Sequence, residues 1–251
     1  MKLFDLHGKT ALVTGGNRGL GGGMAEGLAE AGADIAIVQR SAEETEVAQS
    51  IRQLGRKCQT FSFDLADFNK ISELVQKVEK EFGQIDILVN NAGVQRRSPS
   101  ESFSEQDWDL VMDVNAKSVF FLCQAVGRKM IERGYGKIIN IASLLSFQGG
   151  LNVPAYAAGK GAVAQFTKSL SNEWASKNVN VNAIAPGYMS TDMNTALIND
   201  DTRNRQILER IPAGRWGKPE DMAGAAVFLA SHASDYVNGE IITVDGGWMG
   251  R

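Results

Sequence analysis

The sequence predicts a single α/β domain, spanning residues 1–251, in which helices cover both faces of a doubly wound, seven-stranded parallel sheet. Three observations predict it: short apolar runs alternate with helical patterns, most of these runs are apolar throughout, and no linker-like composition interrupts them. Strands that are buried on both faces are apolar along their whole length, as in a parallel sheet between two layers of helices. The length also allows two small domains, but the uninterrupted pattern favours one.

Seven strands are expected, in sequence order. They cover Thr10–Thr14, Asp34–Val38, Gln59–Phe63, Ile85–Asn90, Lys137–Ala142, Val179–Ile184 and Glu240–Val244. Helical patterns lie between the first strands at Gly21–Ala31, Ala42–Leu54 and Ile71–Phe82, and in the last of these the apolar residues fall on one helix face. This alternation predicts parallel strands joined by right-handed crossovers.

Composition and charge argue against several other classes of protein. The chain is 43% hydrophobic and 22% charged with a formal net charge of −3, so it has no basic excess with which to bind nucleic acid. The N-terminus has no apolar signal core, and no window approaches the ~18 apolar residues of a membrane span. The two cysteines, Cys58 and Cys123, and the two histidines, His7 and His232, do not form a cluster with metal-ligand spacing. We therefore expect a cytoplasmic protein without a metal site and without nucleic acid or membrane as a partner.

A glycine-rich turn follows the first predicted strand and leads into a helix. Its sequence is Thr14-Gly15-Gly16-Asn17-Arg18-Gly19-Leu20-Gly21. Glycines at 15, 19 and 21 allow a sharp turn, a close approach of the backbone to a pyrophosphate and tight packing of the helix against the strand. The start of the helix offers free N–H groups and a positive dipole end to a phosphate. Strand, turn and helix in this order predict a dinucleotide-binding site of the Rossmann type.

Tyr156 and Lys160 stand four residues apart in a segment with a helical pattern. That spacing puts both side chains on one face of the helix. A free tyrosine has a pKa of about 10, and a neighbouring ammonium group lowers that pKa towards the range that a general base needs. Solvated surface helices carry the same pair, so its meaning depends on the residues that accompany it.

Three further polar features accompany the pair. Ser143 follows the strand Lys137–Ala142 directly, at the carboxyl end where open α/β sheets bind ligands. The turn Asn90-Asn91-Ala92-Gly93 ends another strand, and Asn115 lies in a long helical pattern where an amide is otherwise unexplained. Each feature alone could be a turn or a polar helix position. Their occurrence together and in this order indicates a catalytic site.

These motifs together resemble the signature of the short-chain dehydrogenase/reductase family, over about residues 6 to 251. The resemblance implies an NAD(P)-dependent oxidoreductase that moves a hydride to or from a carbinol carbon, with a tetrad of Asn115, Ser143, Tyr156 and Lys160. Tyr156 would exchange a proton with the substrate oxygen that Ser143 holds. Lys160 would lower the pKa of the tyrosine and bind the nicotinamide ribose, and Asn115 would keep a water in a proton relay. Gly159 departs from the serine that is usual in the family, and we expect a softer helix there rather than lost chemistry.

The same resemblance assigns further positions to the cofactor. Asp64 would bind the adenine amine, Asn91 and Gly93 would border the adenine ribose, and the segment from Pro186 to Thr191 would hold the nicotinamide end. The complete expected set is Gly15, Asn17, Arg18, Gly19, Leu20, Gly21, Gln39, Arg40, Asp64, Leu65, Asn91, Ala92, Gly93, Tyr156, Lys160, Pro186, Gly187, Met189 and Thr191.

The choice between NAD and NADP depends on the end of the second strand, Ile37-Val38-Gln39-Arg40. NAD-dependent enzymes of this fold usually carry an acidic residue there, about 20 positions past the glycines, to bind the adenosine ribose. Here that position is Gln39, and the next glutamates come too late. Arg40 and Arg18 stand where NADP-preferring family members keep cations for the 2′-phosphate, so NADP(H) is favoured and NAD(H) is the alternative.

Three stretches, 137–150, 210–217 and 233–239, resemble bacterial family members that act on sugar acids such as gluconate, 2-deoxygluconate or 2-dehydro-3-deoxy-gluconate. A sugar acid offers a carboxylate and several hydroxyls, so its site needs cations and polar groups. Arg96 and Arg97 could form a bidentate pair with a carboxylate. Ser146 and Gln148 could bond hydroxyls, beside Ser143 and Tyr156 at the reacting oxygen. The substrate loops are expected at about 94–103, 144–153 and 187–217.

Two other functions share parts of this pattern. A 3-oxoacyl-(acyl carrier protein) reductase would keep the same tetrad but would need an apolar acyl channel and a basic docking patch. A catalytically silent nucleotide-sensing module would share the fold, but such modules usually lose the tyrosine or the lysine. The C-terminal stretch Ile241–Met249 resembles the last strand and tail through which family members form tetramers, so a homotetramer is expected, with the long helices around Asn115 and Tyr156 as the other interface.

Overall fold

The computed structural model describes residues 2–251, so residue 1 of the expected domain lies outside the described residues. Seven strands form one sheet in the order β3-β2-β1-β4-β5-β6-β7, and every neighbouring pair is parallel. The strands are β1 (Thr10–Thr14), β2 (Asp34–Gln39), β3 (Cys58–Ser62), β4 (Ile87–Asn90), β5 (Gly136–Ile141), β6 (Val179–Pro186) and β7 (Ile241–Val244). The predicted doubly wound parallel sheet is confirmed, and each strand begins and ends within two residues of its expected bounds.

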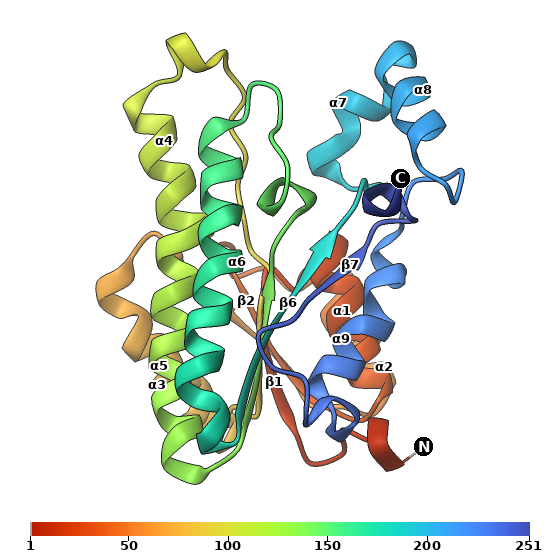
Figure 1. Ribbon diagram of the computed structural model, residues 1–251. Coiled ribbons are helices and arrows are strands. Elements are labelled where there is room, and N and C mark those ends of the chain that lie inside the picture. Colours follow the sequence, from red (N-terminus) through yellow and green to blue (C-terminus); the bar gives the residue numbers. More distant parts are fainter. Residues whose placement is uncertain (1) are drawn as a thin grey trace.

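Helices cover both faces of the sheet (Figure 1). One face carries α1 (Gly19–Glu30), α2 (Glu46–Gln53) and α9 (Ala223–Ala230), and the other carries α3 (Ile71–Phe82), α5 (Ser118–Arg133) and α6 (Pro154–Trp174). Successive strand residues point to opposite layers, so Leu12 packs with α3, α5 and α6 whereas Val13 packs with α1 and α9. The central strands are therefore buried on both faces, which explains their continuous apolar sequence.

One long helix runs across the second layer. It consists of α4 (Glu105–Met112), a π-helical turn (Asp113–Lys117) and α5, and it is continuous over Glu105–Arg133. By length and composition this helix could cross a membrane, so the expectation that no window is apolar enough was wrong. The α5 part of this helix packs against α3, α6 and β4. As a result, 56% of the most apolar window within Glu105–Arg133 is buried in the fold. Its apolar composition is that of a core helix.

Shorter elements gather beyond the carboxyl ends of the strands. Figure 1 shows α7 (Thr195–Ile198) and α8 (Asp201–Arg210) there, beside the C-terminus. The ring of Trp248 packs between the segment before α7 and the end of α8. Its centre lies 4.6 Å from the ring of Tyr188 and 4.0 Å from the guanidinium group of Arg210. Short 3-10 helices complete the chain at Lys2–Phe4, Phe68–Lys70, Ser100–Ser102, Leu144–Ser146, Ala175–Lys177, Asp192–Asn194, Pro219–Met222, His232–Ser234 and Trp248–Gly250.

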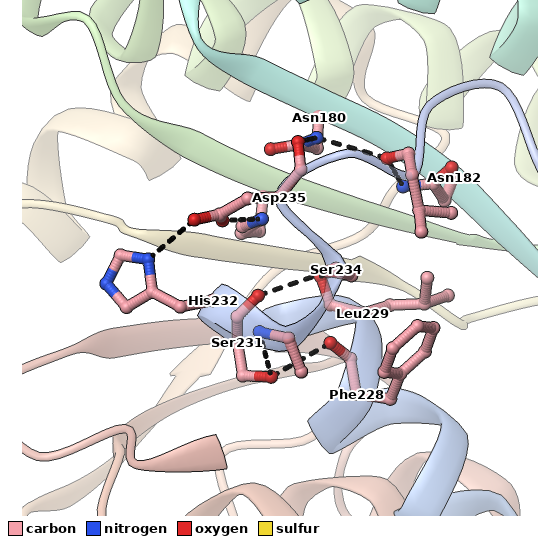
Figure 2. A network of polar contacts seen from close by, with 11 residues as sticks. Asn180, Asn182, Phe228, Leu229, Ser231, His232, Ser234 and Asp235 are labelled. Atoms are coloured by element: carbon pink, nitrogen blue, oxygen red, sulfur yellow. Dashed lines mark hydrogen bonds and ion pairs between the residues drawn. The ribbon is translucent and has the colours of Figure 1, made fainter. Parts of the chain in front are cut away.

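A polar network holds the opposite, amino-terminal end of the sheet (Figure 2). Lys137 in β5 is only 1% exposed, and its ammonium group donates to Asp235 Oδ1 at 2.7 Å. The same carboxylate contacts His232 Nδ1 at 3.0 Å, and the Asn180 amide donates to the carbonyl oxygens of Asp235 and Val237. Burial lowers the pKa of Lys137, and the ion pair with Asp235 opposes that change. The network ties the segment before β7 to the starts of β5 and β6.

Candidate active site

A cavity of about 590 Å³ opens at the carboxyl ends of the strands, where the strand order reverses between β1 and β4. Open α/β sheets bind their ligands at such a reversal. Strands β1 to β6 all end on its wall, through residues that include Gly15, Gln39, Asp64, Asn91, Ser143 and Gly187. Every residue expected to contact the cofactor lines the cavity except Gly21. Since these residues come from distant parts of the chain, the sheet topology is what brings them together.

The glycine loop has the backbone geometry of a phosphate cradle. Gly15 and Gly19 adopt φ angles of +63° and +53°, in the left-handed region that favours glycine. A Cβ atom on Gly21 would lie 2.1 Å from the carbonyl oxygen of Gly15, so α1 can pass this close to the loop only with glycine there. The first N–H groups of α1 have no carbonyl partner within the helix and are available to an anion. The loop and the cavity therefore fit a dinucleotide.

Two side chains hold this loop against the neighbouring turn. The hydroxyl of Thr14 accepts hydrogen bonds from the N–H groups of Asn91 and Ala92, both at 3.0 Å. The side-chain amide of Asn91 donates to the carbonyl oxygens of Thr14 and Gly15 at 3.0 and 3.2 Å. The Asn91 amide thus shapes the loop, which adds a positioning task to the ribose contact expected for this residue. Thr14 was expected only as the first residue of the glycine-rich turn, since a threonine that ends a strand carries no signal for this contact.

Cations and one amide line the end of the cavity near β2. Gln39 is buried, and its Nε2 donates to the carbonyl oxygen of Glu43 at 2.7 Å. Arg40 is exposed on the cavity wall. Arg18 reaches instead to Asp192 across a 2.7 Å ion pair, in which the two side chains are 71% and 78% exposed. Asp192 also lines the cavity, so this pair joins the glycine loop to the 3-10 turn before α7.

Tyr156 and Lys160 lie one turn apart on α6, which starts at Pro154 because proline needs no hydrogen-bond partner in the first turn of a helix. The ammonium group of Lys160 donates to the carbonyl oxygen of Ile141 at 2.5 Å and lies 5.8 Å from the centre of the Tyr156 ring. Burial lowers the pKa of Lys160 to about 8. Burial raises the pKa of Tyr156, whereas the hydrogen bond with Ser143 and the positive charge of Arg97 lower it. The charge of Arg97 thus favours the phenolate form of Tyr156, and the expected contribution of Lys160 to lowering the same pKa stays a prediction.

Ser143 reaches the cavity from the end of β5. It caps the 3-10 turn Leu144–Ser146, and its hydroxyl accepts from the N–H of Leu145 at 3.1 Å. The hydroxyl of Ser146 donates to the carbonyl oxygen of Lys160 at 2.7 Å and accepts from the N–H of Ser143 at 3.2 Å. Neither Ser146 nor Gln148 is among the described residues that line the cavity. Backbone partners thus engage the hydroxyl of Ser146, and the expected contact of Gln148 with a substrate hydroxyl stays a prediction.

Asn115 occupies the centre of the π-helical turn and is completely buried. Its amide pairs with the backbone of Val94 through two hydrogen bonds of 2.8 Å, one donated in each direction. A π-turn frees backbone carbonyl groups from the regular helical pattern and is common at functional sites. A Cβ atom on Gly159 would lie 3.4 Å from the Cβ of Asn115, so glycine allows α6 a close approach to this turn.

The two arginines expected to bind a carboxylate lie on the loop after β4. Arg96 lines the cavity, and its Nε lies 3.1 Å from Asp107 Oδ1. Arg97 donates to Gln95 Oε1 at 2.9 Å, and it is not among the described residues on the cavity wall. The N–H of Ser98 donates to the carbonyl oxygen of Asn152 at 3.0 Å, which ties this loop to the segment before Tyr156. Arg97 is thus held within electrostatic reach of the tyrosine.

Comparisons with known proteins decide the family. A family model described as enoyl-(acyl carrier protein) reductase matches residues 15–249. The 2-dehydro-3-deoxy-D-gluconate 5-dehydrogenase of Dickeya dadantii is 55% identical, over 100% of this chain and 99% of that protein. The chain is a member of the short-chain dehydrogenase/reductase family. It is therefore an oxidoreductase that uses a nicotinamide cofactor, as the sequence predicted.

Other members of the family share both sequence and structure with it. The gluconate 5-dehydrogenase of Gluconobacter oxydans is 46% identical, over 98% of this chain and 96% of that protein. A gluconate 5-dehydrogenase from Burkholderia cenocepacia, solved in complex with NADP and tartrate, is 45% identical with a TM-score of 0.96, over 100% of this chain and 98% of that chain. In both comparisons the likeness covers nearly the whole of each chain.

The cavity of this short-chain dehydrogenase/reductase also includes residues that were not expected individually from the sequence. Asp192, Met193 and Asn194 line it from the 3-10 turn before α7. Asn194 donates to the carbonyl oxygen of Met189 at 2.8 Å and so ties this turn to the segment after β6. The turn falls within the substrate loop expected at about 187–217, but no motif marks its individual residues.

Proposed function

We propose that this oxidoreductase transfers a hydride between nicotinamide and a hydroxyl or keto carbon of a sugar acid of the gluconate, 2-deoxygluconate or 2-dehydro-3-deoxy-gluconate type. The observation that carries the proposal is the loop after β4, which is tied to the segment before Tyr156, places Arg96 on the cavity wall and holds the charge of Arg97 within electrostatic reach of Tyr156. Two relatives that share 55% and 46% of their residues with this chain are named for sugar acids.

The described residues would divide the reaction as follows. When bound, the nicotinamide supplies or accepts the hydride. The hydroxyl of Tyr156 gives a proton to the substrate oxygen during reduction and takes it back during oxidation. The hydroxyl of Ser143 donates a hydrogen bond to the same oxygen and stabilises its developing charge. Lys160, whose pKa burial lowers to about 8, can exchange a proton near neutral pH, and Asn115 would keep a water in the proton relay from Lys160.

Arg97→Ala tests the sugar-acid assignment. We expect the KM for a sugar acid to rise ~10- to 100-fold, because a charged hydrogen bond contributes about 1.5–3 kcal/mol. The KM for a neutral polyol should change far less, since a polyol has no carboxylate to lose. Arg97→Lys keeps the charge but not the bidentate geometry and serves as the matched control. Equal changes in KM for the sugar acid and the polyol would contradict a contact between Arg97 and the substrate carboxylate.

We propose further that NADP(H) is the preferred cofactor. Arg40 is the exposed cation on the cavity wall beside Gln39, and the Burkholderia cenocepacia relative was solved with NADP. We expect Arg40→Ala to lower kcat/KM for NADP ~10-fold or more and to change kcat/KM for NAD less than ~2-fold. Steady-state rates with both cofactors measure this ratio. An equal loss with NAD and NADP would contradict the phosphate contact at Arg40.

We also propose that the protein is a homotetramer located in the cytoplasm. Support comes from the partly exposed apolar side chains Trp108 and Phe121 on the long helix, where a second copy could pack. The thiols of Cys58 and Cys123 are unpaired, as is usual in a reducing compartment.

The rival function, a 3-oxoacyl-(acyl carrier protein) reductase, shares the tetrad, and turnover of an acetoacetyl thioester in place of sugar acids would favour it.

A further inference from the structure

We propose that Ser146 is a positioning residue that aligns Ser143 with Lys160, and that its hydroxyl takes no part in binding the substrate. The inference rests on the catalytic roles proposed for Ser143, Tyr156 and Lys160. It replaces the sugar-hydroxyl contact expected of Ser146 with a task inside the active-site framework.

The hydrogen bonds of Ser146 leave it little capacity for a substrate. A hydroxyl has one proton to donate and two lone pairs. Here the proton goes to the carbonyl oxygen of Lys160 at 2.7 Å, and the N–H of Ser143 occupies a lone pair at 3.2 Å. The side chain is half-buried and is not among the described residues on the cavity wall.

These contacts close a ring between the end of β5 and α6. Ser143 lies two residues after Ile141, whose carbonyl oxygen accepts from the Lys160 ammonium group at 2.5 Å. The ring starts at Ile141 and follows the chain to Ser143, whose N–H donates to the hydroxyl of Ser146. That hydroxyl donates to the carbonyl oxygen of Lys160, and the ammonium group of Lys160 donates back to the carbonyl oxygen of Ile141. A closed ring restricts both the separation and the relative rotation of the strand end and the helix.

Neither β5 nor α6 needs the hydrogen bond from Ser146 to Lys160 for its own structure. A serine that only completes a capping box needs its contact with the N–H of the N-cap residue, here Ser143. The Ser146 proton instead goes to Lys160, fourteen residues further along the chain. In a helix, the carbonyl oxygen of Lys160 already accepts the regular bond from four residues ahead. The additional bond therefore contributes alignment between two elements, and the aligned groups are the hydroxyl of Ser143 and the face of α6 that carries Tyr156.

Loss of the ring should affect the chemical step more than binding. Without Ser146, the N–H of Ser143 loses its acceptor and the turn Leu144–Ser146 can rotate relative to α6. A displacement of about 1 Å at reacting groups can lower a rate ~10²-fold. The phosphate cradle and the arginine loop do not belong to the ring, so affinity for cofactor and substrate should survive.

The experiment compares Ser146→Ala with Ser231→Ala. Ser231 makes the same kinds of contact in another 3-10 turn, since its hydroxyl donates to the carbonyl oxygen of Phe228 at 3.0 Å and accepts from the N–H of Ala233 at 3.4 Å. Ser231 belongs to the polar contacts near Asp235 (Figure 2) and is not among the described residues on the cavity wall, so it controls for the loss of a capping hydroxyl. We expect Ser146→Ala to lower kcat ~10- to 100-fold, with KM and the Kd of NADPH within ~2-fold of wild type. Ser231→Ala should leave kcat unchanged.

Two further variants keep the test decisive. Ser146→Thr retains the hydroxyl and should restore most of kcat. Ser146→Cys has a weaker donor of similar size, so its kcat should lie between wild type and alanine, and it replaces the alanine variant if that variant does not fold. A raised KM for the sugar acid at unchanged kcat, or wild-type kcat in the alanine or cysteine variant, would overturn the proposal.

The ratio of variant to wild-type kcat can be measured with any alcohol or ketone that the wild type turns over. Inactivity with every sugar acid would therefore contradict the proposed substrate while leaving the test of Ser146 intact. An equal fractional loss of kcat with a sugar acid and with a neutral polyol is the result expected of a positioning residue.

Discussion

Tyr156→Phe is expected to lower kcat at least ~10²-fold, the lower end of the contribution of general acid–base catalysis. The substitution keeps the ring that lies 5.8 Å from the Lys160 ammonium group and removes only the hydroxyl that exchanges the proton. The Kd of NADPH, measured by fluorescence titration, should stay within ~3-fold of wild type because the glycine loop is untouched. Near-normal turnover by the variant would overturn the assignment of Tyr156 as the acid/base.

The pH dependence of the wild type should report the same hydroxyl. Oxidation needs the deprotonated tyrosine and therefore rises with pH through its pKa, whereas reduction needs the protonated form and falls there. Burial raises the pKa of Tyr156 and the charge of Arg97 lowers it. Removing that charge in Arg97→Ala should consequently move the rising limb of oxidation to higher pH, a change separate from the effect on KM.

Gly21→Ala is expected to have the second large effect. The new Cβ would lie 2.1 Å from the carbonyl oxygen of Gly15 and 2.4 Å from Asn91 Nδ2, so the phosphate loop or the start of α1 must move. We expect the Kd of NADPH to rise ~10-fold or more and the free energy of unfolding to fall by about 1–3 kcal/mol, as for other overpacked sites. Ligand titration and denaturant unfolding measure the two effects.

Gly224→Ala is the matched control for this substitution. Gly224 lies in α9, is exposed, and has nothing within 4 Å of an added Cβ atom. Alanine there should leave cofactor affinity unchanged and should not lower stability, because alanine is the better helix former. Equal loss of affinity in both variants would show that the close contact between Gly21 and Gly15 is unimportant.

Much of this fold could be predicted because its signals are local. Continuous apolar runs mark strands that are buried on both faces, and the turn around Gly15 needs glycine wherever it occurs. The order of Asn115, Ser143, Tyr156 and Lys160 along the chain is equally readable, and the cavity brings Ser143, Tyr156 and Lys160 together beside the buried Asn115.

The features that could not be predicted depend on the local helix geometry, on where a side chain points, or on partners that are distant in the sequence. Nothing in the sequence around Asn115 distinguishes a π-turn from a regular helix, because one extra residue in a turn leaves the apolar pattern nearly unchanged. Ser146 has the residue type and position of a substrate contact, but its hydroxyl points to Lys160 instead. Arg18 meets a partner 174 residues away in sequence, a contact that only the folded chain defines.

The polar network around Lys137 and Asp235 separates two demands that this enzyme must meet. It anchors the chain at one end of the sheet, and the residues that bind and transform ligands lie at the other. Substitutions near Lys137 are therefore expected to change the free energy of unfolding more than turnover, whereas substitutions in the loop around Arg97 are expected to change substrate preference more than stability.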